Sequence, residues 1–332
     1  MKAAAVAGGL LVLLPLLVGS TFYVNLASQV LIAAILALSL NVLVGYGGLT
    51  SLGHAAYLGA CAYLVIHLTT REGFGHLGAA AAALALTTAM AMLFGILALR
   101  ATGLGFLMIT LALGQILWGL AYRWAAFTGG DNGLAGLTRP SPLGIDLSQP
   151  EAFYYFVLVV FAVAFVAMAR FARSPFGQCL QGVRDQPRRM STLGHHVWMV
   201  QWLSYVYAGF WGAVAGLLYA YYHQYVSPHA LGLTSSAEAL LMVISGGAGT
   251  LVGPVVGAAL VVLLKNLASA YVTRWVMLLG VVFVVIVQFM PEGLVPGVTR
   301  LVGALRRRAR TPAPGKGPAE SSSPLPAKEN ST

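Results

Sequence analysis

The chain has 332 residues, of which 58% are hydrophobic and only 8% charged, whereas about a quarter of the residues of an average soluble protein carry charge. No polar stretch as long as a domain, on the order of 100 residues, is left over, which excludes a soluble enzyme on a membrane anchor. The net charge of +10 comes from basic residues scattered over short loops, so nucleic acid is not an expected partner.

The apolar segments predict an all-α polytopic membrane protein of about ten transmembrane helices, because a span needs about 20 apolar residues and the backbone in lipid must satisfy its own hydrogen bonds. In chain order the segments are Ala3 to Val18, Leu26 to Val44, Leu52 to Thr69, Leu77 to Leu99, Leu104 to Tyr122, Ala152 to Ala169, Trp198 to Tyr222, Ser236 to Val252, Pro254 to Ala270 and Trp275 to Phe289. The first segment resembles a signal peptide but lacks an A-x-A cleavage site. We therefore expect residues 1–19 to be retained as the first span.

The basic residues of the connections predict the orientation, because Lys and Arg favour the cytoplasmic side. With an even number of spans and the N-terminus inside, the cytoplasm receives Lys2, Arg100, Arg170, Arg173, Arg184, Arg188, Arg189, Arg300, Arg306, Arg307, Arg308 and Arg310. The outer side receives Arg71, Arg123, Arg139 and Arg274, together with Glu72, Asp131, Asp146 and Glu151. Both termini are expected in the cytoplasm, since an odd number of spans would move Lys2 or the last arginines outside.

The predicted membrane domain covers residues 1–300 and contains a basic cytoplasmic loop at 170–197. Residues 301–332 form a tail that is first basic and then rich in Pro, Ser and Gly, a composition typical of disorder. Cys61 lies in an apolar segment and Cys179 in the basic loop, so we expect no disulfide.

Two glycine-rich stretches interrupt apolar segments, namely GYGGLTSLGHAAYLGA from Gly45 and SGGAGTLVGPVVGA from Ser245. Glycine-interrupted helices in an inverted repeat indicate a transport pathway. The alternative is that the glycines only allow helices to pack closely.

His54, Glu238 and Lys265 are the main ionisable residues of the predicted spans, and such residues are functional candidates by default. The small residues around His54 fit either a cavity wall or a tight helix contact. Glu238 and Lys265 can instead extend separately to a membrane interface, which we favour. The candidate pathway residues are Gly47, Gly48, Ser51, His54, Gln115, Glu238, Ser245, Gly246 and Gly247.

The cytoplasmic loop is predicted to contain one short amphipathic helix. Pro187 suits the first turn, Asp185 places negative charge at its start and Gly194 suits its end. Its apolar face would be Met190, Leu193 and Val197, and its basic flank Arg184, Arg188 and Arg189. Such a helix can dock on a soluble partner or lie on lipid headgroups.

The sequence lacks the motifs that mark nucleotide-binding, metal-binding and hydrolase sites. The sequence lacks G-x-x-x-x-G-K-[ST], so any ATP hydrolysis must come from another chain. It also lacks H-E-x-x-H, a Cys and His cluster and G-x-S-x-G, so we expect no metal, cofactor or catalytic residue. An intramembrane enzyme with His54 and Glu238 as acid and base is a weaker hypothesis, since no nucleophile accompanies them. A lone channel is a third possibility.

The motifs resemble, in order and spacing, the permease subunits of bacterial branched-chain amino acid ABC importers, with the M-type permease the closer match. The segments that carry the resemblance are LNVLVGYGGLTSLGHAAYLGACAY from Leu40, GLGFLMITLALGQIL from Gly103, TGGDNGLAGL from Thr128, SPFGQCLQGVRDQPRRMSTLGHHV from Ser174 and SAEALLMVISGGAGTLVGPVVGAAL from Ser236. MPEGL from Met290 resembles the closing R-P-x-G-L of that family, with Met290 where a basic residue is usual.

The resemblance implies an importer in a bacterial inner membrane. Its other parts would be a second permease, two cytoplasmic ATP-binding subunits and an extracytoplasmic substrate-binding protein, which would hold most of the selectivity. It implies that Arg184 to Gly194 docks on the ATPase. The coupling residues are then Arg184, Asp185, Arg188, Arg189, Met190, Leu193 and Gly194. Related importers carry urea and short amides, but SLGHAAYLG from Ser51 looks more like the amino acid branch.

Overall fold

The computed structural model describes residues 15, 20–140 and 147–271, and scattered positions from 277 to 300. The chain divides into two units, Met1–Gly297 and Val298–Thr332, and of the second unit only Arg300 is described. Except for Pro15, the predicted span Ala3 to Val18 lies outside the described residues. The tail 301–332 does so entirely, and Trp275 to Phe289 does so in part.

Five of the described helices are long and apolar enough to cross a membrane. They are α2 (Thr21–Asn41) with its π-helical extension η1 (Val42–Tyr46), α4 (His76–Ala98), α5 (Leu104–Arg123), α7 (Pro150–Arg173) and α10 (Val197–His223). Three further apolar helices are shorter, namely α3 (Ala55–Thr70), α11 (Leu233–Gly246) and α12 (Gly253–Tyr271). The all-α membrane fold is thereby confirmed, while the count of about ten spans and the repeat remain predictions.

Two of the predicted spans are longer than the helices that the structure shows. The segment Leu52 to Thr69 becomes helical only at Ala55, and Ser236 to Val252 is helical only as far as Gly246. Gly48 and Gly247 have φ angles of 67° and 117°, which side-chain-bearing residues rarely adopt and which end a helix. The apolar pattern does not mark these helix ends, because non-helical residues such as Gly53 are buried as well. With 16 and 14 residues, α3 and α11 fall below the length of about 20 that spans a bilayer.

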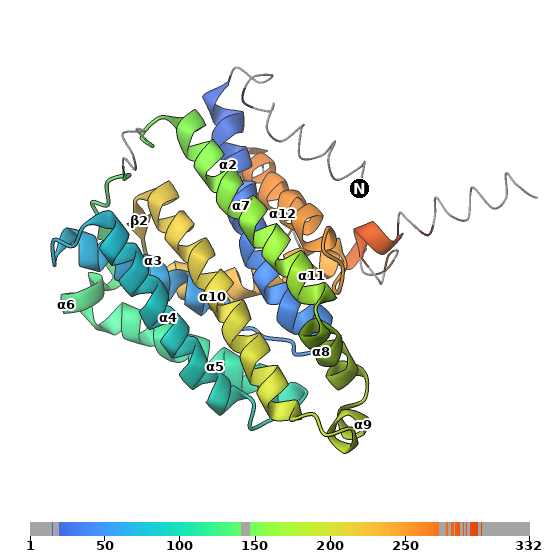
Figure 1. Cartoon of the computed structure of the whole chain (residues 1–332). Coiled ribbons are helices and arrows are strands. Elements are labelled where there is room, and N and C mark those ends of the chain that lie inside the picture. Colours follow the sequence, from blue (N-terminus) through green and yellow to red (C-terminus); the bar gives the residue numbers. More distant parts are fainter. Residues whose placement is uncertain are drawn as a thin grey trace, which may run out of the picture. The chain divides into compact units, whose positions relative to one another are not determined.

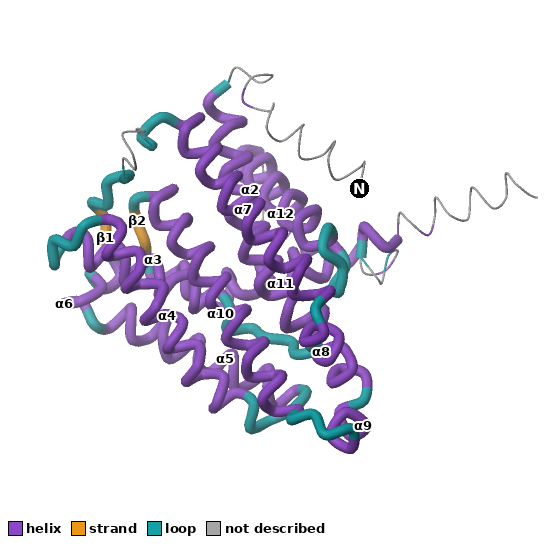
Figure 2. The backbone as a smooth tube through the Cα atoms, in the orientation of Figure 1, coloured by secondary structure: helices purple, strands orange, loops and turns teal. Residues whose placement is uncertain are grey.

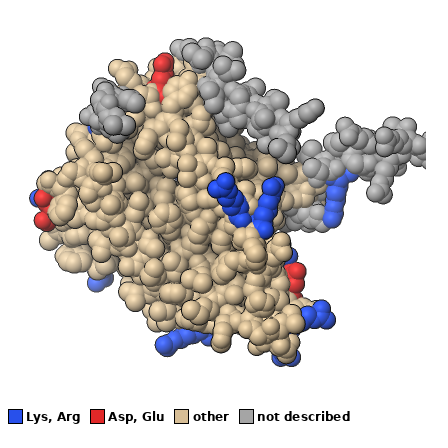
Figure 3. Space-filling model, in the orientation of Figure 1, with Lys and Arg blue, Asp and Glu red and all other residues tan. Residues whose placement is uncertain are grey.

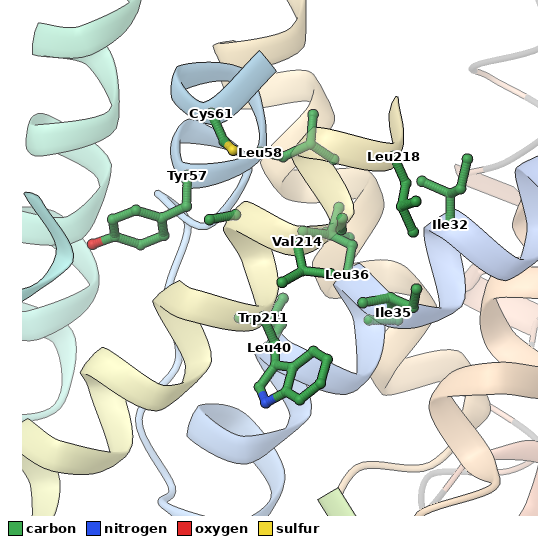
Figure 4. Close-up of a cluster of buried hydrophobic side chains, with 14 of the residues drawn as sticks. Ile32, Ile35, Leu36, Leu40, Tyr57, Leu58, Cys61, Trp211, Val214 and Leu218 are labelled. Atoms are coloured by element: carbon green, nitrogen blue, oxygen red, sulfur yellow. The ribbon is translucent and has the colours of Figure 1, made fainter. Parts of the chain in front are cut away.

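The core lies where α2, α3 and α10 meet (Figure 4). Figure 1 shows α2 beside α7 and α12, with α10 next to α3 and α4. Ile35, Leu40 and Leu218 are at most 1% exposed. A Cβ at Gly216 would overlap the backbone carbonyl of Leu58, so this glycine allows α10 and α3 to approach closely.

The outward faces of α4 and α5 are apolar. Leu86, Leu93, Met108 and Ile116 are more than half exposed, as expected of side chains that face lipid rather than water. Figure 3 shows a broad surface with few charged side chains.

The loop between α5 and α7 and the segment after α10 are joined by two short strands (Figure 2). β1 (Leu134–Ala135) pairs antiparallel with β2 (Tyr225–Val226), with Leu134 opposite Val226. Before β1 come α6 (Ala125–Thr128) and the 3₁₀ turn η2 (Gly130–Asn132). The remaining short elements are α8 (Pro175–Asp185), α9 (Pro187–Thr192) and η4 (Pro228–Leu231).

Candidate functional site

The two glycine-rich breaks contact each other. The Asn41 side chain donates from Nδ2 to the carbonyl of Thr250 and accepts at Oδ1 from the backbone N–H of Gly249, both at 2.9 Å. A Cβ at Gly45 would overlap the backbone of Gly249. The ends of α2 and α11 are thus connected through backbone contacts that require glycine.

Arg184, in α8, reaches this junction from the loop 170–197. Its Nη1 donates to the carbonyl of Gly45 at 2.6 Å, and its Nε pairs with Asp185 at 2.9 Å. A Cβ at Gly48 would meet the aliphatic part of the same side chain. The loop predicted to be cytoplasmic therefore contacts a break in a membrane helix directly.

The helix α8 was missed in the sequence. Ser174 caps it by accepting the N–H of Gly177 at 3.1 Å, and Pro175 occupies its first turn. Leu180 and Val183 are fully buried one turn apart. The Ser174-Pro175 pair and the spacing of Leu180 and Val183 are the features of the sequence that predict this helix.

The prediction of a single helix in the loop was wrong. Asp185 ends α8 instead of starting the following helix, and Val197 already belongs to α10, so Met190, Leu193 and Val197 do not share one helix face. The start of α9 at Pro187 and the stop near Gly194, whose φ is 88°, are as predicted. The break at Gln186, with an extended backbone before Pro187, separates the two helices. Arg188 and Arg189 are exposed, Leu193 is 68% exposed, and Met190 packs against Gly182.

The starts of the two short helices lie together. The backbone N–H of Ala55 in α3 donates to Oγ of Ser236 in the first turn of α11 at 3.3 Å. A non-helical stretch precedes α3 and the 3₁₀ turn η4 precedes α11, and Leu231 of η4 packs against Gly59 of α3. Helix N-termini carry unpaired N–H groups and positive partial charge, so this junction favours negative groups.

His54 forms a tight contact. It is fully buried just before α3, and its Nε2 lies 2.8 Å from Oγ of Ser39 while its ring packs edge-on against Tyr57. Within the described residues its Nδ1 has no hydrogen-bond partner. Ser51 is also buried and accepts the N–H of Gly53 at 3.4 Å.

Glu238 and Lys265 pair with each other, a contact that the sequence did not indicate. The Lys265 Nζ lies 3.1 and 3.2 Å from the two carboxylate oxygens. The side chain of Glu238 is 15% exposed and that of Lys265 41%. His54 therefore contacts Ser39 and Glu238 contacts Lys265, whereas the enzyme hypothesis would pair His54 with Glu238 as acid and base.

Two hollows share this ion pair. A pocket of about 140 Å³ is lined by α2, α3, α10, α11 and α12, and an open groove of about 570 Å³ by α5, η4, α11 and α12. Glu238, Lys265 and Ser235 line both. Gln115 lines only the groove.

The predicted pathway residues thus fall into separate groups. Gly47, Gly48 and Gly247 lie at the glycine breaks, and Gly246 packs tightly against Gly253. Gln115 and Glu238 lie at the hollows. Ser245 donates to the carbonyl of Leu241 within its own helix. In the part of the chain that the structure describes, no three His, Cys, Asp or Glu side chains gather as metal ligands.

Known proteins resemble the chain over most of its length. The permease proteins LivM of the high-affinity branched-chain amino acid transport systems of Salmonella typhimurium and Escherichia coli are each 26% identical to it over 296 residues, covering 82% of this chain and 70% of the relative. A probable branched-chain amino acid transport permease protein LivM of Methanocaldococcus jannaschii is 24% identical over 181 residues, or 49% of this chain and 52% of the relative. No solved structure matches.

A family model described as the permease component of the branched-chain amino acid transport system matches residues 22–287. This range contains both glycine breaks, α8 and the ion pair of Glu238 and Lys265. The chain is therefore a multi-pass membrane protein of the family of branched-chain amino acid transport permeases.

Proposed function

We propose that this chain forms, with a second permease, the membrane route of an ATP-driven importer of leucine, isoleucine and valine. Two cytoplasmic ATP-binding subunits supply the energy, and an extracytoplasmic binding protein delivers the solute. The importer lies in a bacterial inner membrane with both termini of this chain in the cytoplasm. The contact of Arg184 with Gly45 carries the proposal, because it connects the cytoplasmic loop to a broken membrane helix.

The loop 170–197 is the coupling segment in this proposal. The ATPase docks on the exposed surface of α9 and the turn after it, where Arg188, Arg189 and Leu193 lie. Asp185 and Gly194 lie at the two ends of this surface. Movement of α8 reaches Gly45 through Arg184, and Gly249 through Asn41.

The route itself follows the broken helices. The long α2 and the short α3 are separated by a non-helical stretch, and the long α10 and the short α11 by β2 and the 3₁₀ turn η4. We take these pairs as the two halves of an inverted repeat, whose short helices meet at Ala55 and Ser236. Discontinuous helices whose N-termini converge are the usual substrate site in transporters built this way.

A polar route is needed because a zwitterionic amino acid crosses lipid only at a large desolvation cost. The chain alone would move no solute, since it has no phosphate-binding loop.

The test is reconstitution of the copurified complex in liposomes with its binding protein. We expect uptake of leucine, isoleucine and valine that depends on ATP and on the binding protein. Uptake of urea or a short amide without uptake of these amino acids would overturn the substrate assignment. Uptake by this chain without its partners would overturn the importer assignment in favour of a lone channel.

A further inference from the structure

We propose that the ion pair of Glu238 and Lys265 is a binding site for the zwitterionic head group of an aliphatic amino acid within the membrane domain. Glu238 binds the ammonium group and Lys265 the carboxylate, and the aliphatic side chain enters the smaller pocket. The inference rests on the proposed function and adds a site on this chain to the one expected on the outer binding protein.

The position of the pair supports a ligand site. The two side chains come from α11 and α12 and stand at the boundary between the pocket of about 140 Å³ and the open groove of about 570 Å³. A structural ion pair between two packed helices needs neither hollow. Because Lys265 remains 41% exposed, its ammonium group can be reached by a solute.

Charge balance favours a zwitterion. The pair is neutral as a whole, and a zwitterion that inserts between the two groups gives each of them a new partner of opposite charge. A solute with one charge would separate the pair without offering an opposite charge to both side chains, which is unfavourable for the Glu238 carboxylate at 15% exposure. The site therefore selects against amines, amides and acids of similar shape.

The pocket suits an aliphatic side chain. Its apolar lining comes from several helices and includes Ile32, Leu36, Leu58, Met242 and Val261. A cavity needs only about 10–15 Å³ to hold one water, so a volume of about 140 Å³ has room for the four-carbon side chain of leucine.

The surroundings also favour the carboxylate. Ala55 and Ser235 line the pocket from the first turns of α3 and α11, where the N-terminal ends of helices attract negative charge. The ligand can thus lie with its carboxylate between Lys265 and these helix ends.

The test measures binding of radiolabelled leucine to the permease complex in nanodiscs without the outer binding protein. We expect leucine to compete about tenfold or more better than leucinamide, which lacks the carboxylate, and 4-methylpentanoate, which lacks the ammonium group. The loss of one hydrogen bond between charged groups weakens binding by at least about that factor. Equal competition by all three, or no leucine binding by the folded complex, would overturn the site.

A second arm uses the paired variant Glu238→Gln with Lys265→Gln, whose amides can still bond to each other across α11 and α12. We expect it to assemble normally and to lose leucine binding about tenfold or more. The matched control is Glu72→Gln, which removes an exposed carboxylate that pairs with His67 and lines neither hollow. Unchanged binding and uptake in the paired variant would reduce the ion pair to a helix contact and leave the importer function intact. Absence of amino acid uptake in the unmodified importer would instead reject the function.

Discussion

The guanidinium of Arg184 donates to the backbone carbonyl of Gly45 at 2.6 Å, across 139 positions of the chain. Gly45 in turn packs against Gly249, whose N–H binds Asn41. One side chain thereby joins a surface helix to both glycine breaks. A carbonyl freed from regular helix bonding is a strong acceptor, and a charged donor satisfies it well.

Replacement of Arg184 by Gln should lower leucine uptake about tenfold or more, because a charge-assisted bond to Gly45 is lost. Arg184→Lys should retain part of the activity, since one donor remains without the planar fork. Arg100→Gln is the control, because Arg100 is exposed just after α4 and lies outside the loop 170–197. Equal uptake by the Arg184 and Arg100 variants, measured at matched membrane levels, would contradict the role of Arg184.

Gly45→Ala should destabilise the protein by about 1–3 kcal/mol, the usual range for overpacking, because the added Cβ overlaps backbone atoms of Gly249 that cannot turn aside. Gly119→Ala is the matched control, since nothing lies within 4 Å of its Cβ position and Ala favours a helix by up to about 1 kcal/mol. Thermal unfolding in detergent compares the two. A Gly45→Ala protein as stable as the Gly119→Ala protein would show that the breaks do not pack this closely.

Leu193→Asp should release the ATP-binding subunits while the permease stays inserted, because a charge replaces an exposed apolar anchor in the proposed contact. Copurification of the ATPase at normal expression measures this. Arg188→Glu with Arg189→Glu tests the alternative that the loop lies on lipid, where each basic residue contributes about 1 kcal/mol at an anionic surface. On that alternative the variant loosens the loop from the membrane surface, and the assembled complex survives. If Leu193→Asp retains the ATPase at the original ratio, with uptake unchanged, the loop does not couple.

The orientation can be tested with cysteines at Asn132 and Arg188 in a background of Cys61→Ala and Cys179→Ser. Tyr225, which follows α10, donates to the carbonyl of Asn132, and Arg188 precedes the start of α10, so the 27 residues of that helix separate them. A helix of that length is roughly 40 Å long and crosses a bilayer. A membrane-impermeant reagent on intact cells should label only position 132, and labelling of both positions would refute the proposed topology.

Arg139→Lys should loosen the loop between α5 and α7. Arg139 donates to the carbonyls of Tyr221, Tyr222, Leu147 and Ser148 and covers the ring of Phe153 at 4.5 Å. Burial lowers the pKa of Arg139, because the charged group loses solvation there, and these acceptors compensate for that loss. Lysine cannot reach several acceptors at once, so we expect faster proteolysis of residues 123–149. Arg123→Lys, which changes an exposed residue, should cleave at the original rate.

The apolar segments determined the class of the protein, because burial in lipid requires long hydrophobic helices whatever their packing. The basic composition of the loop 170–197 and the end of a helix near Gly194 were likewise predictable from the sequence, since they depend on local composition and on one backbone angle. Hydropathy could not show that the chain before Ala55 and after Gly246 is non-helical, because buried residues are apolar in either conformation.

Contacts between distant segments were decided only by the tertiary structure. Nothing in the order of residues indicates that Arg184 would bind Gly45, or that Asn41 would bind Gly249, since each contact depends on how the helices pack. Glu238 and Lys265 are 27 positions apart in the sequence, and only the packing of α11 against α12 brings their charges within 3.1 Å. The sequence by itself thus determined the all-α membrane class, while packing decided which polar groups meet inside the protein, because a buried charge is stable only beside the partner that the fold supplies.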